Sequence, residues 1–355
     1  MRVLITGGAG FVGGNLAVGL ASRHPDWQIV ALDNLHRRGS ELNLPRLREA
    51  GVQFVQGDVR DRENLAAVGQ IDALVECSAE PSVLAGTDGS PDYLVGTNLF
   101  GAFECLELCR RHGAQLVFLS TSRVYPVAHL CAAELDETEA RFRLAEHQPM
   151  PGLSVHGVSE SFPLDGARTL YGTTKLAAEH LVEEYAAVFG LPTVVNRFGV
   201  IAGPWQMGKV DQGVLAYWLL AHHFGRPLEY IGFGGSGKQV RDVLHVEDAV
   251  ELIDLQLADR ERWAGAVVNA GGGAERSVSL LELTELCREL TGRTTAVGGS
   301  TAERPGDIPL YVSDCRHLFS LADWRPRRDV RDVLRDLYDW IVRNESDLRR
   351  MNEWE

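Results

Sequence analysis

Residues 2–15 read RVLITGGAGFVGGN, and residues 28–33 read QIVALD. The opening apolar run is typical of a buried parallel strand, and the glycine-rich turn after it leads into an apolar helical stretch predicted over Gly10 to Ser22. The second run, Gln28 to Asp33, is another strand that ends in a carboxylate. Strand, glycine loop, helix and strand together form a βαβ unit, which is how a parallel α/β sheet begins.

The alternation of short strands and longer helices continues through the first half of the chain. Further strands are predicted at Gln53 to Gln56, Ala73 to Cys77, Gln115 to Ser120 and Thr193 to Arg197, and further helices at Tyr93 to His112 and Leu170 to Phe189. Six parallel strands predict a doubly wound Rossmann sheet, in which ligands lie beyond the carboxyl ends of the strands. Functional residues are expected at that edge.

The second half of the chain predicts a smaller α/β lobe that binds substrate. After Arg197 the pattern becomes irregular, and two apolar-periodic helices follow at Val278 to Leu290 and Val330 to Arg343. Because Val267 to Ala270 is typical of a further sheet strand, the chain is expected to return to the first lobe. The expected domains are a Rossmann domain over 1–196 with a return segment at about 238–270, and a substrate lobe over 197–237 and 271–355.

Charge and hydropathy limit the function classes. The 355 residues carry a formal net charge of -14. This balance disfavours binding to nucleic acid or to anionic membranes, because both need clustered Lys and Arg. No apolar run reaches the roughly 18 residues of a membrane span, and the chain opens directly on a strand, which leaves no room for a signal peptide. A cytoplasmic location is expected.

The six cysteines predict neither disulfides nor a metal site. They include no CxxC pair, and Cys105 and Cys109 have no further His or Cys nearby at ligand spacing. Reduced thiols are the expectation for such a chain.

The glycine loop has the spacing of a dinucleotide site. Gly7, Gly10 and Gly13 follow one another at intervals of three where the first helix opens. Unpaired N–H groups and the positive end of a helix dipole there attract a pyrophosphate. Asp33 lies twenty residues beyond Gly13, at a strand end where a carboxylate accepts hydrogen bonds from the adenosine ribose.

The acid at position 33 also bears on which dinucleotide binds. A carboxylate repels a 2′-phosphate, so NAD is favoured, although the neighbouring Arg37 and Arg38 leave NADP open. Asp58 and Val59 follow the third strand, where a carboxylate could receive the adenine amino group. The alternative interpretation of Asp58 is a solvated acid at a strand end.

Tyr171 and Lys175 carry the predicted chemistry. They belong to the sequence YGTTK, and a spacing of four residues puts both on one face of the helix. A phenol of unperturbed pKa near 10 is a poor base, but a neighbouring ammonium and an oxidised nicotinamide favour the phenolate. Tyr171 could then remove a hydroxyl proton while Lys175 also reaches the nicotinamide ribose. A YxxxK pair alone is common on exposed helices, so this hypothesis depends on the glycine loop.

Thr121 is the third candidate catalytic residue. The sequence Ser120-Thr121-Ser122-Arg123 follows the apolar run LVFL, which puts a hydroxyl at the carboxyl end of the fifth strand. Thr121 could bond the reacting sugar oxygen and share its proton with Tyr171. The alternative is a hydroxyl that caps the local backbone.

Taken together, these motifs resemble the extended short-chain dehydrogenase/reductases that act on nucleotide sugars. The similarity covers nearly the whole chain and includes Asn98 with Gly101 and the stretch GKQVRDVLHVED at 237–248. Within that family the chain is most similar to the CDP-paratose 2-epimerases, also called CDP-tyvelose 2-epimerases. The stretches that carry this similarity are DNLHRRG at 33–39, DETEARF at 136–142, VDQG at 210–213 and GKQVRDVLH at 237–245.

The resemblance implies an epimerisation without net redox change. NAD that stays bound takes hydride from sugar C2 while Tyr171 removes the proton, and the ketone then turns over and receives the hydride on its other face. Further cofactor contacts are implied at Phe11, Val12, Asn34 and Asn98. The implied substrate contacts are Glu80, Thr121, Ser122, Arg123, Gln212, Arg241 and Arg304.

The resemblance also implies how the phosphates and the subunits are held. Arg241 and Arg304 match the positions that clamp the substrate pyrophosphate, a task that suits guanidinium groups. Their alternative interpretation is as surface ion-pair arginines. A homodimer or homotetramer is implied through the helices predicted at Tyr93 to His112 and Leu170 to Phe189.

Two departures from the family pattern affect the substrate prediction. Glu76-Cys77-Ser78-Ala79-Glu80 stands where the family resembles HLAAQ or HLAGQ, and Leu170 replaces the proline common before the catalytic tyrosine. Glu80 could contact a hydroxyl or an amine that paratose lacks, so the sugar stays open.

Several rival functions share this scaffold. The 4,6-dehydratases resemble Thr-Asp-Glu after the strand, and the decarboxylating enzymes place a glutamate two residues after the threonine, whereas here Ser122 and Arg123 follow Thr121. A nucleotide-sugar 4-epimerase and an NAD(P)H-dependent keto-sugar reductase remain alternatives. A non-catalytic redox sensor typically lacks the Tyr and Lys, and this chain has both.

Overall fold

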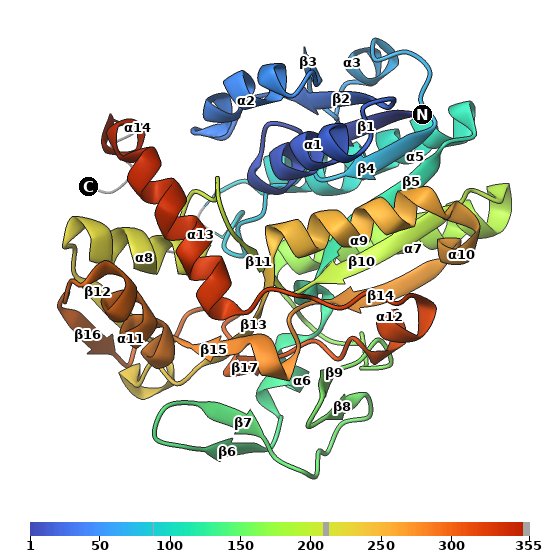
Figure 1. The fold of residues 1–355 in the computed structure, drawn as a ribbon. Coiled ribbons are helices and arrows are strands. Elements are labelled where there is room, and N and C mark those ends of the chain that lie inside the picture. The colour runs from blue at the N-terminus through green and yellow to red at the C-terminus, as the bar shows by residue number, and fades with distance from the viewer. Residues whose placement is uncertain (88, 209–212, 351–355) are drawn as a thin grey trace. The chain divides into compact units, whose positions relative to one another are not determined.

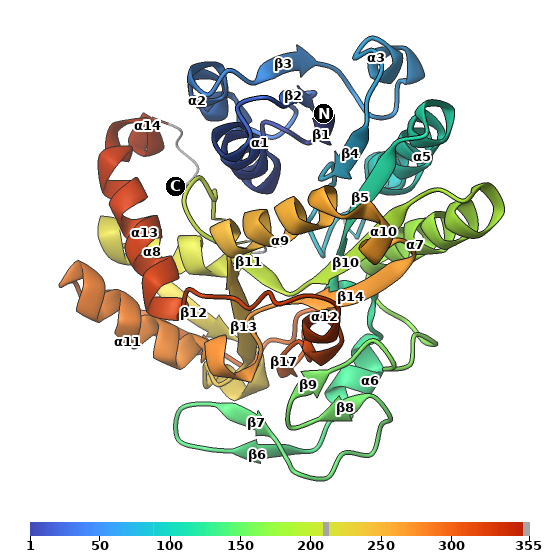
Figure 2. The same ribbon diagram turned by 45° about the vertical axis from the view of Figure 1, so that its right-hand side comes forward.

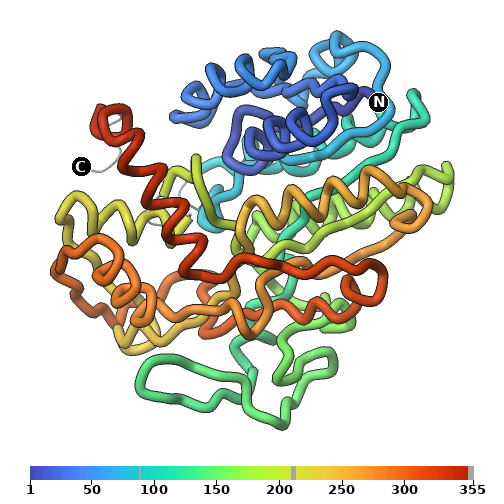
Figure 3. Tube along the Cα trace, in the orientation of Figure 1, coloured from blue at the N-terminus to red at the C-terminus, as the bar shows by residue number. Residues whose placement is uncertain are grey.

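The computed structural model describes residues 1–87, 89–208 and 213–350, which form two compact units. The first unit comprises Met1–Val124, Leu170–Phe198 and Ala249–Val268. The second comprises Tyr125–Thr169, Gly199–Asp248 and the part of the chain from Asn269 onward. Each unit is therefore built from three separate stretches of the chain. Figure 3 traces the course of the chain from the N-terminus to the C-terminus.

A seven-stranded sheet is the centre of the first unit (Figure 1), with the strand order β14-β10-β5-β4-β1-β2-β3. Its strands are β1 Arg2–Thr6, β2 Gln28–Asp33, β3 Gln53–Gln56, β4 Ala73–Glu76, β5 Gln115–Thr121, β10 Thr193–Phe198 and β14 Ala266–Ala270. The pairs β1 with β2 and β4, β2 with β3, and β5 with β4 and β10 are parallel. The predicted doubly wound α/β sheet is confirmed, with strand ends that differ from the prediction by at most one residue.

Helices cover both faces of this sheet (Figures 1 and 2). Helices α1 (Phe11–Arg23) and α9 (Val246–Ala258) lie on one face, and α5 (Gly101–His112) and α7 (Leu170–Phe189) lie on the other. The close packing of α1 on α9 requires a glycine, because a Cβ at Gly19 would lie 2.7 Å from Val250. Residues of α5 and α7 join those of the strands in one buried core, which explains why the central strands are apolar on both sides.

The helix predicted at Tyr93 to His112 is confirmed as three consecutive pieces. These are α4 (Asp92–Val95), a π-helical turn η2 (Gly96–Phe100) and α5. The π turn contains Asn98, and such turns often mark functional positions because they re-aim a side chain. Helix α7 has the predicted bounds. It begins at Leu170, so the helix forms with a leucine before Tyr171.

The second unit combines short strands with three longer helices. Strands β11 (Val200–Ala202), β13 (Val240–His245), β15 (Ser277–Ser279) and β17 (Leu310–Tyr311) form one sheet, and β12 (Leu228–Ile231) pairs with β16 (Val297–Ser300). Two hairpins follow the first unit's β5 in sequence: β6 (Leu135–Glu137) with β7 (Phe142–Leu144), and β8 (Leu153–Ser154) with β9 (Gly157–Val158). The helices are α8 (Val214–Phe224), α11 (Leu280–Thr291) and α13 (Val330–Arg343).

Capping residues set the ends of two predicted helices. Ser279 and Glu282 form a capping box, so α11 begins at Leu280 and the residues expected in its first turn belong to β15 instead. Asp329 and Asp332 form the same kind of box, and α13 has the predicted bounds. No helix among the described residues is long and apolar enough to cross a membrane. The shorter helices are η1 Ser40–Asn43, α2 Leu44–Glu49, α3 Arg62–Ala66, η3 Ser122–Val124, α6 Val127–Cys131, η4 Phe233–Gly235, α10 Arg260–Trp263, η5 Ala274–Arg276, α12 Arg316–Leu321 and α14 Glu345–Arg350.

Candidate active site

The glycine loop between β1 and α1 has no room for side chains. Gly7 has a φ of +62°, and a Cβ on it would lie 2.8 Å from the carbonyl oxygen of Cys77. A Cβ on Gly13 would lie 2.2 Å from the carbonyl oxygen of Gly7. Gly10 is the N-cap of α1 and makes no side-chain cap, so the first N–H groups of the helix face the loop. The loop therefore fits a dinucleotide pyrophosphate.

Asp33 ends β2 and supports this loop. Its carboxylate accepts hydrogen bonds from the N–H of Ala9 at 3.0 Å and of Leu35 at 2.8 Å. Burial raises the pKa of Asp33, and these backbone hydrogen bonds oppose that rise. The predicted cofactor residues Phe11 and Val12 form the first two positions of α1, directly after the loop.

Asn34 and Asp58 lie together at the ends of β2 and β3. The amide nitrogen of Asn34 donates to Asp58 at 2.9 Å. Arg60 holds the same carboxylate through Nε at 2.9 Å and Nη2 at 2.8 Å, and this contact holds the pKa of Asp58 well below its usual range. The Arg60 guanidinium also lies 4.9 Å from the centre of the Tyr93 ring. The sequence indicated the acid but not its arginine partner.

Asn98 connects the segment after β4 to the candidate catalytic helix. Its side chain is fully buried, accepts from the N–H of Glu80 at 2.8 Å and donates to the carbonyl of Glu80 at 3.1 Å. The same amide donates to the hydroxyl of Thr174 at 3.2 Å, and Thr174 in turn donates to the carbonyl of Tyr171 at 2.8 Å. The predicted cofactor residue Val59 is buried in the same core as α5. Asn98 thus fixes both Glu80 and the first turn of α7.

Lys175 is buried one turn after Tyr171 on α7. Its Nζ lies 3.1 Å from Oε2 of Glu76, at the end of β4, and 4.5 Å from the centre of the Phe118 ring on β5. Burial lowers the pKa of Lys175, but the charges of Glu76 and Tyr171 more than offset it, so the pKa lies above its usual value. Lys175 is therefore an ammonium that is paired with Glu76, and Tyr171 lies one helical turn before it on α7.

Thr121 lies at the carboxyl end of β5, three residues beyond Phe118. It is 9% exposed, and its hydroxyl oxygen accepts from the N–H of Arg123 at 3.2 Å. Ser122 and Arg123 form the short η3 turn that follows. Since Glu76 is the register partner of Phe118, Lys175 reaches across the ends of the two strands that carry Glu76 and Thr121.

A buried ion pair that the sequence reading missed holds α7 beneath these residues. Glu179 accepts from Nη2 of Arg197 on β10 at 2.7 Å and from the hydroxyl of Ser120. Tyr171, Lys175 and Glu179 follow one another at intervals of four, so they share one helix face. The signal in the sequence is Glu179 itself, a charged residue within an apolar stretch of the helix, which indicates a buried partner of opposite charge.

In the second unit, Arg241 and Arg304 both contact Asp307. Arg241 on β13 donates to the Asp307 carboxylate at 3.0 Å and to the carbonyl of Ile308 at 2.8 Å. The carbonyl of Arg304 accepts from the N–H of Asp307 at 3.1 Å in a tight turn. The two predicted clamp arginines therefore lie at one loop, while Gln212 is outside the described residues.

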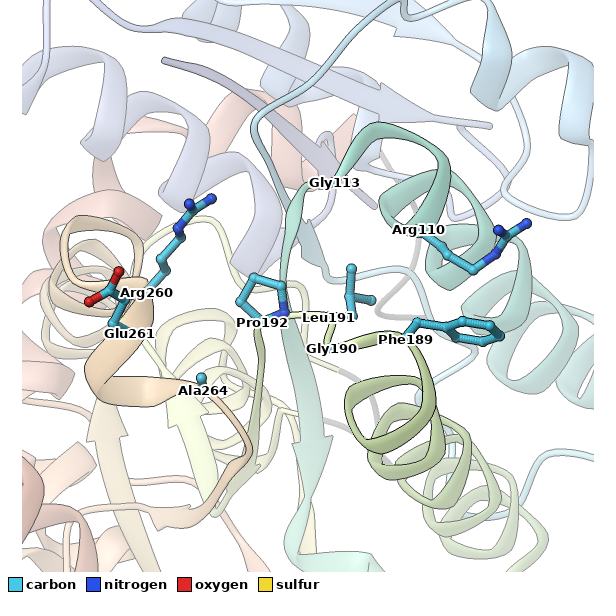
Figure 4. A pocket seen from close by; sticks show the side chains of 9 residues that line it. All are labelled: Arg110, Gly113, Phe189, Gly190, Leu191, Pro192, Arg260, Glu261 and Ala264. Carbon is cyan, nitrogen blue, oxygen red and sulfur yellow. The ribbon is translucent and has the colours of Figure 1, made fainter.

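A pocket of about 350 Å³ lies at the opposite edge of the first unit's sheet (Figure 4). Its lining residues are Arg110, Gly113, Phe189, Gly190, Leu191, Pro192, Arg260, Glu261 and Ala264. Gly113, Pro192 and Ala264 precede β5, β10 and β14, so the pocket is at the amino ends of these strands. Ligands of such sheets bind at the carboxyl ends, and we assign this pocket no role in the chemistry. Among the described residues, no group of His, Cys, Asp and Glu is placed to hold a metal ion.

Comparisons with known proteins identify the family of the chain. Residues 3–271 match the NAD dependent epimerase/dehydratase family. The chain is 30% identical over 351 residues to CDP-paratose 2-epimerase of Salmonella typhi, covering 96% of this chain and 99% of that protein. It is also 30% identical over 348 residues to dTDP-glucose 4,6-dehydratase of Mycobacterium tuberculosis, covering 98% of this chain and 95% of that protein.

A solved structure supports the same assignment. UDP-glucose 4-epimerase of Thermus thermophilus, in complex with NAD, superposes with a TM-score of 0.75 at 27% identity, covering 96% of this chain and 99% of that one. The expected family and its NAD dependence are thereby confirmed. The chain belongs to the NAD-dependent epimerase/dehydratase family.

Proposed function

We propose that this protein epimerises a nucleotide sugar at a hydroxyl-bearing carbon, with C2 of a CDP-sugar such as CDP-paratose or CDP-tyvelose as the favoured position. The observation that carries the proposal is the grouping of Lys175 with the ends of β4 and β5, one helical turn from Tyr171 and beside the strand that ends in Thr121. In such a site NAD supplies the hydride acceptor and donor, and the protein supplies the base.

Tyr171 acts as the general base and Lys175 as its electrostatic support. The ammonium of Lys175 favours the phenolate form of a tyrosine on the same helix face. It also has N–H groups beyond the one that faces Glu76, and these serve the cofactor ribose. Thr121 donates its hydroxyl hydrogen to the reacting oxygen, while its own oxygen accepts from the backbone N–H of Arg123.

The residues after Thr121 favour epimerisation over dehydration. Eliminating water needs an additional acid and base close to the sugar. The turn after β5 offers Ser122 and Arg123, neither of which is a carboxylate. The dehydratase relative and the epimerase relative are both 30% identical to this chain, so identity does not decide between the two activities. The residues of this turn are the basis for favouring epimerisation.

The proposed substrate contacts follow from the similarity to CDP-paratose 2-epimerase. Arg241 and Arg304 hold the pyrophosphate, with Asp307 keeping Arg241 in a fixed orientation. Glu80 and Arg123 face the sugar, and Gln212 belongs to the VDQG stretch that favours a cytidine nucleotide. A nucleotide-sugar 4-epimerase is the second candidate, because the Thermus thermophilus relative has that activity.

A panel of CDP-, UDP-, GDP- and dTDP-sugars tests the proposal. Each is incubated with the enzyme in ordinary and in deuterated water and then analysed by proton NMR and mass spectrometry. The expected product has the mass of its substrate, one inverted carbon, and no deuterium at that carbon. Loss of a water molecule would identify a dehydratase, and inversion at C4 would identify the second candidate.

Cofactor retention separates the epimerase from a keto-sugar reductase. An epimerase regenerates NAD in each turnover, so purified protein should carry stoichiometric NAD through gel filtration. A reductase consumes NADH or NADPH and must release the oxidised form. Protein that elutes free of dinucleotide and turns over only with added NAD(P)H would support the reductase.

We also propose a cytoplasmic homodimer or homotetramer that assembles through α5 and α7. Large apolar side chains are exposed at the ends of these helices: Phe100 60%, Val188 66% and Phe189 53%. Exposed apolar side chains on two neighbouring helices are available to a subunit interface. Light scattering should show at least twice the 39.0 kDa chain mass, and a single 39.0 kDa species would contradict the proposal.

A further inference from the structure

Glu76 is a buried carboxylate directly beneath the candidate catalytic pair. Its side chain is 1% exposed, and one oxygen lies 3.1 Å from Nζ of Lys175, whose own side chain is 3% exposed. The other oxygen, Oε1, is buried without a hydrogen-bond partner among the described residues. A carboxylate this deep is stable only beside a cation, so Glu76 and Lys175 depend on each other.

The Glu179–Arg197 ion pair lies one turn further along α7, and the groups that otherwise surround Glu76 and Lys175 are thiols, a phenol and an aromatic ring. Lys175 interacts electrostatically with Glu76 and Cys77 on the β4 side and with Tyr171 on its own helix. The Phe118 ring of β5 also faces its ammonium group. The charge of Glu76 also acts on the thiol of Cys105 on α5 and raises its pKa. Burial holds the thiols of Cys77 and Cys105 in their neutral form, because it raises the pKa of each well above its usual value. Burial raises the pKa of Glu76, and the charge and hydrogen bond of Lys175 oppose that rise, so Glu76 is the carboxylate that is paired with Lys175.

We propose that Glu76 is a positioning residue that keeps Lys175 protonated and directed toward the end of β4, and so keeps Tyr171 beside a cation. This inference rests on the proposed function, since it assigns Tyr171 and Lys175 the roles given there. It also gives a purpose to a glutamate at a position where related sequences resemble HLAAQ.

Two opposing effects of Glu76 must be weighed. Its negative charge disfavours the Tyr171 phenolate directly, but it also favours the charged form of Lys175. Lysines that are buried without a countercharge lose their proton at pH values as low as about 5–6. Burial is the largest influence on Lys175, and Glu76 is the main group that opposes it. The loss of Glu76 should therefore neutralise Lys175 near neutral pH. This loss of the ammonium should outweigh the removal of the Glu76 charge, so the Tyr171 phenolate should become harder to form.

The test is a titration of the NAD-loaded protein that does not require turnover. The phenolate of Tyr171 is followed by its near-ultraviolet absorbance, as the difference between each protein and the same protein with Tyr171→Phe. In Glu76→Gln the phenolate should form at a pH higher by about one unit or more, which is a tenfold change in proton affinity. The acidic limb of the pH–rate profile should move in the same direction, with NAD still bound.

Two further variants make the result decisive. Glu179→Gln also removes one charge from a buried ion pair on α7, so it should lower Tm without moving the titration. Glu76→Asp keeps the charge but withdraws it by one methylene, so its phenolate titration should lie between those of the wild type and Glu76→Gln. The same variant provides the test if Glu76→Gln does not fold. A titration that is unchanged or moves to lower pH in these Glu76 variants overturns the inference. If no nucleotide sugar is turned over, the proposed function fails while the absorbance titration still tests Glu76.

Discussion

The amide of Asn98 and the hydroxyl of Thr174 lie 3.2 Å apart, and this contact ties the π-helical turn after α4 to the first turn of α7. Asn98 also holds both backbone groups of Glu80, and Thr174 holds the carbonyl of Tyr171. A single buried side chain therefore orients the segment after β4 and the start of the candidate catalytic helix. Asn98 thus sets the position of Glu80 relative to the backbone of Tyr171.

Asn98→Ala should lower both stability and turnover. It removes three hydrogen bonds from buried or half-buried groups, each worth about 1 kcal/mol, so the free energy of unfolding should fall by roughly 2–3 kcal/mol. Turnover should fall about tenfold or more, because small misplacements of a catalytic group are costly. Chemical denaturation and kcat measurements check both expectations.

Thr174→Val is the matched control for that substitution. It removes one hydroxyl and leaves the contacts of Asn98 with Glu80, so its effect should be smaller. In the double variant the two losses should not add, because both remove the same contact. Additive losses would show that Asn98 and Thr174 act independently.

Asp33→Asn should weaken NAD binding about 10- to 100-fold. The variant keeps one oxygen to accept a hydrogen bond but loses the charge and one of the two acceptors that hold Ala9 and Leu35. A hydrogen bond to a charged group is worth about 1.5–3 kcal/mol, which corresponds to this range. Calorimetric titration of the cofactor-free protein with NAD and with NADP measures it. The wild type should prefer NAD, and an equal or greater affinity for NADP would contradict the role given to Asp33.

Most of the first unit could be predicted because its signals are local. The strands are short apolar runs that end in Gly, Asp or Ser, and α7 is a long periodic segment, so the predictions at 2–6, 28–33, 53–56 and 170–189 match the structure. The second unit was harder because its strands have two to six residues and pair across long separations. Strand β13, for example, pairs with β11, β15 and β17, so no single stretch of sequence specifies that sheet.

The candidate site follows the same division. The spacing of Tyr171 and Lys175 predicts one helix face, and the glycine loop predicts a turn that admits only glycine at Gly7 and Gly13. The partner of Lys175 could not be predicted, because Glu76 is 99 residues away and contacts it only once β4 and α7 are packed. Arg60 likewise engages Asp58 through a local conformation that charge patterns do not specify.

Tyr171→Phe should retain NAD but lose turnover by about 10²–10⁴-fold, the usual contribution of a general base. The substitution removes one oxygen and leaves the glycine loop, Asp33 and Lys175 in place. Tyr185→Phe is the control on the same helix, since Tyr185 donates to Glu107 and has no role in the proposed chemistry. Single-turnover assays of both variants, with bound NAD quantified after denaturation, provide the comparison. A Tyr171→Phe enzyme with near wild-type turnover would remove Tyr171 from its role.

Glu107 on α5 accepts a hydrogen bond from Tyr185 on α7, and we expect the stability that this contact provides to depend on pH. Hydrogen bonds from Arg110 and from Tyr185, at 2.9 and 2.7 Å, lower the pKa of Glu107 from 4.5 to about 2, against the opposing effect of burial. Because the folded-state pKa is depressed, the stabilisation is present above pH 4.5 and is lost as the pH falls toward 2. Arg110 is exposed, so solvent screening keeps this contribution to stability small. Glu107→Gln should therefore be less stable than the wild type at pH 7, and the difference in free energy of unfolding should shrink as the pH is lowered. Denaturant titrations at several pH values follow this difference, and one that is constant from pH 7 to pH 3 would show that the charge of Glu107 contributes nothing.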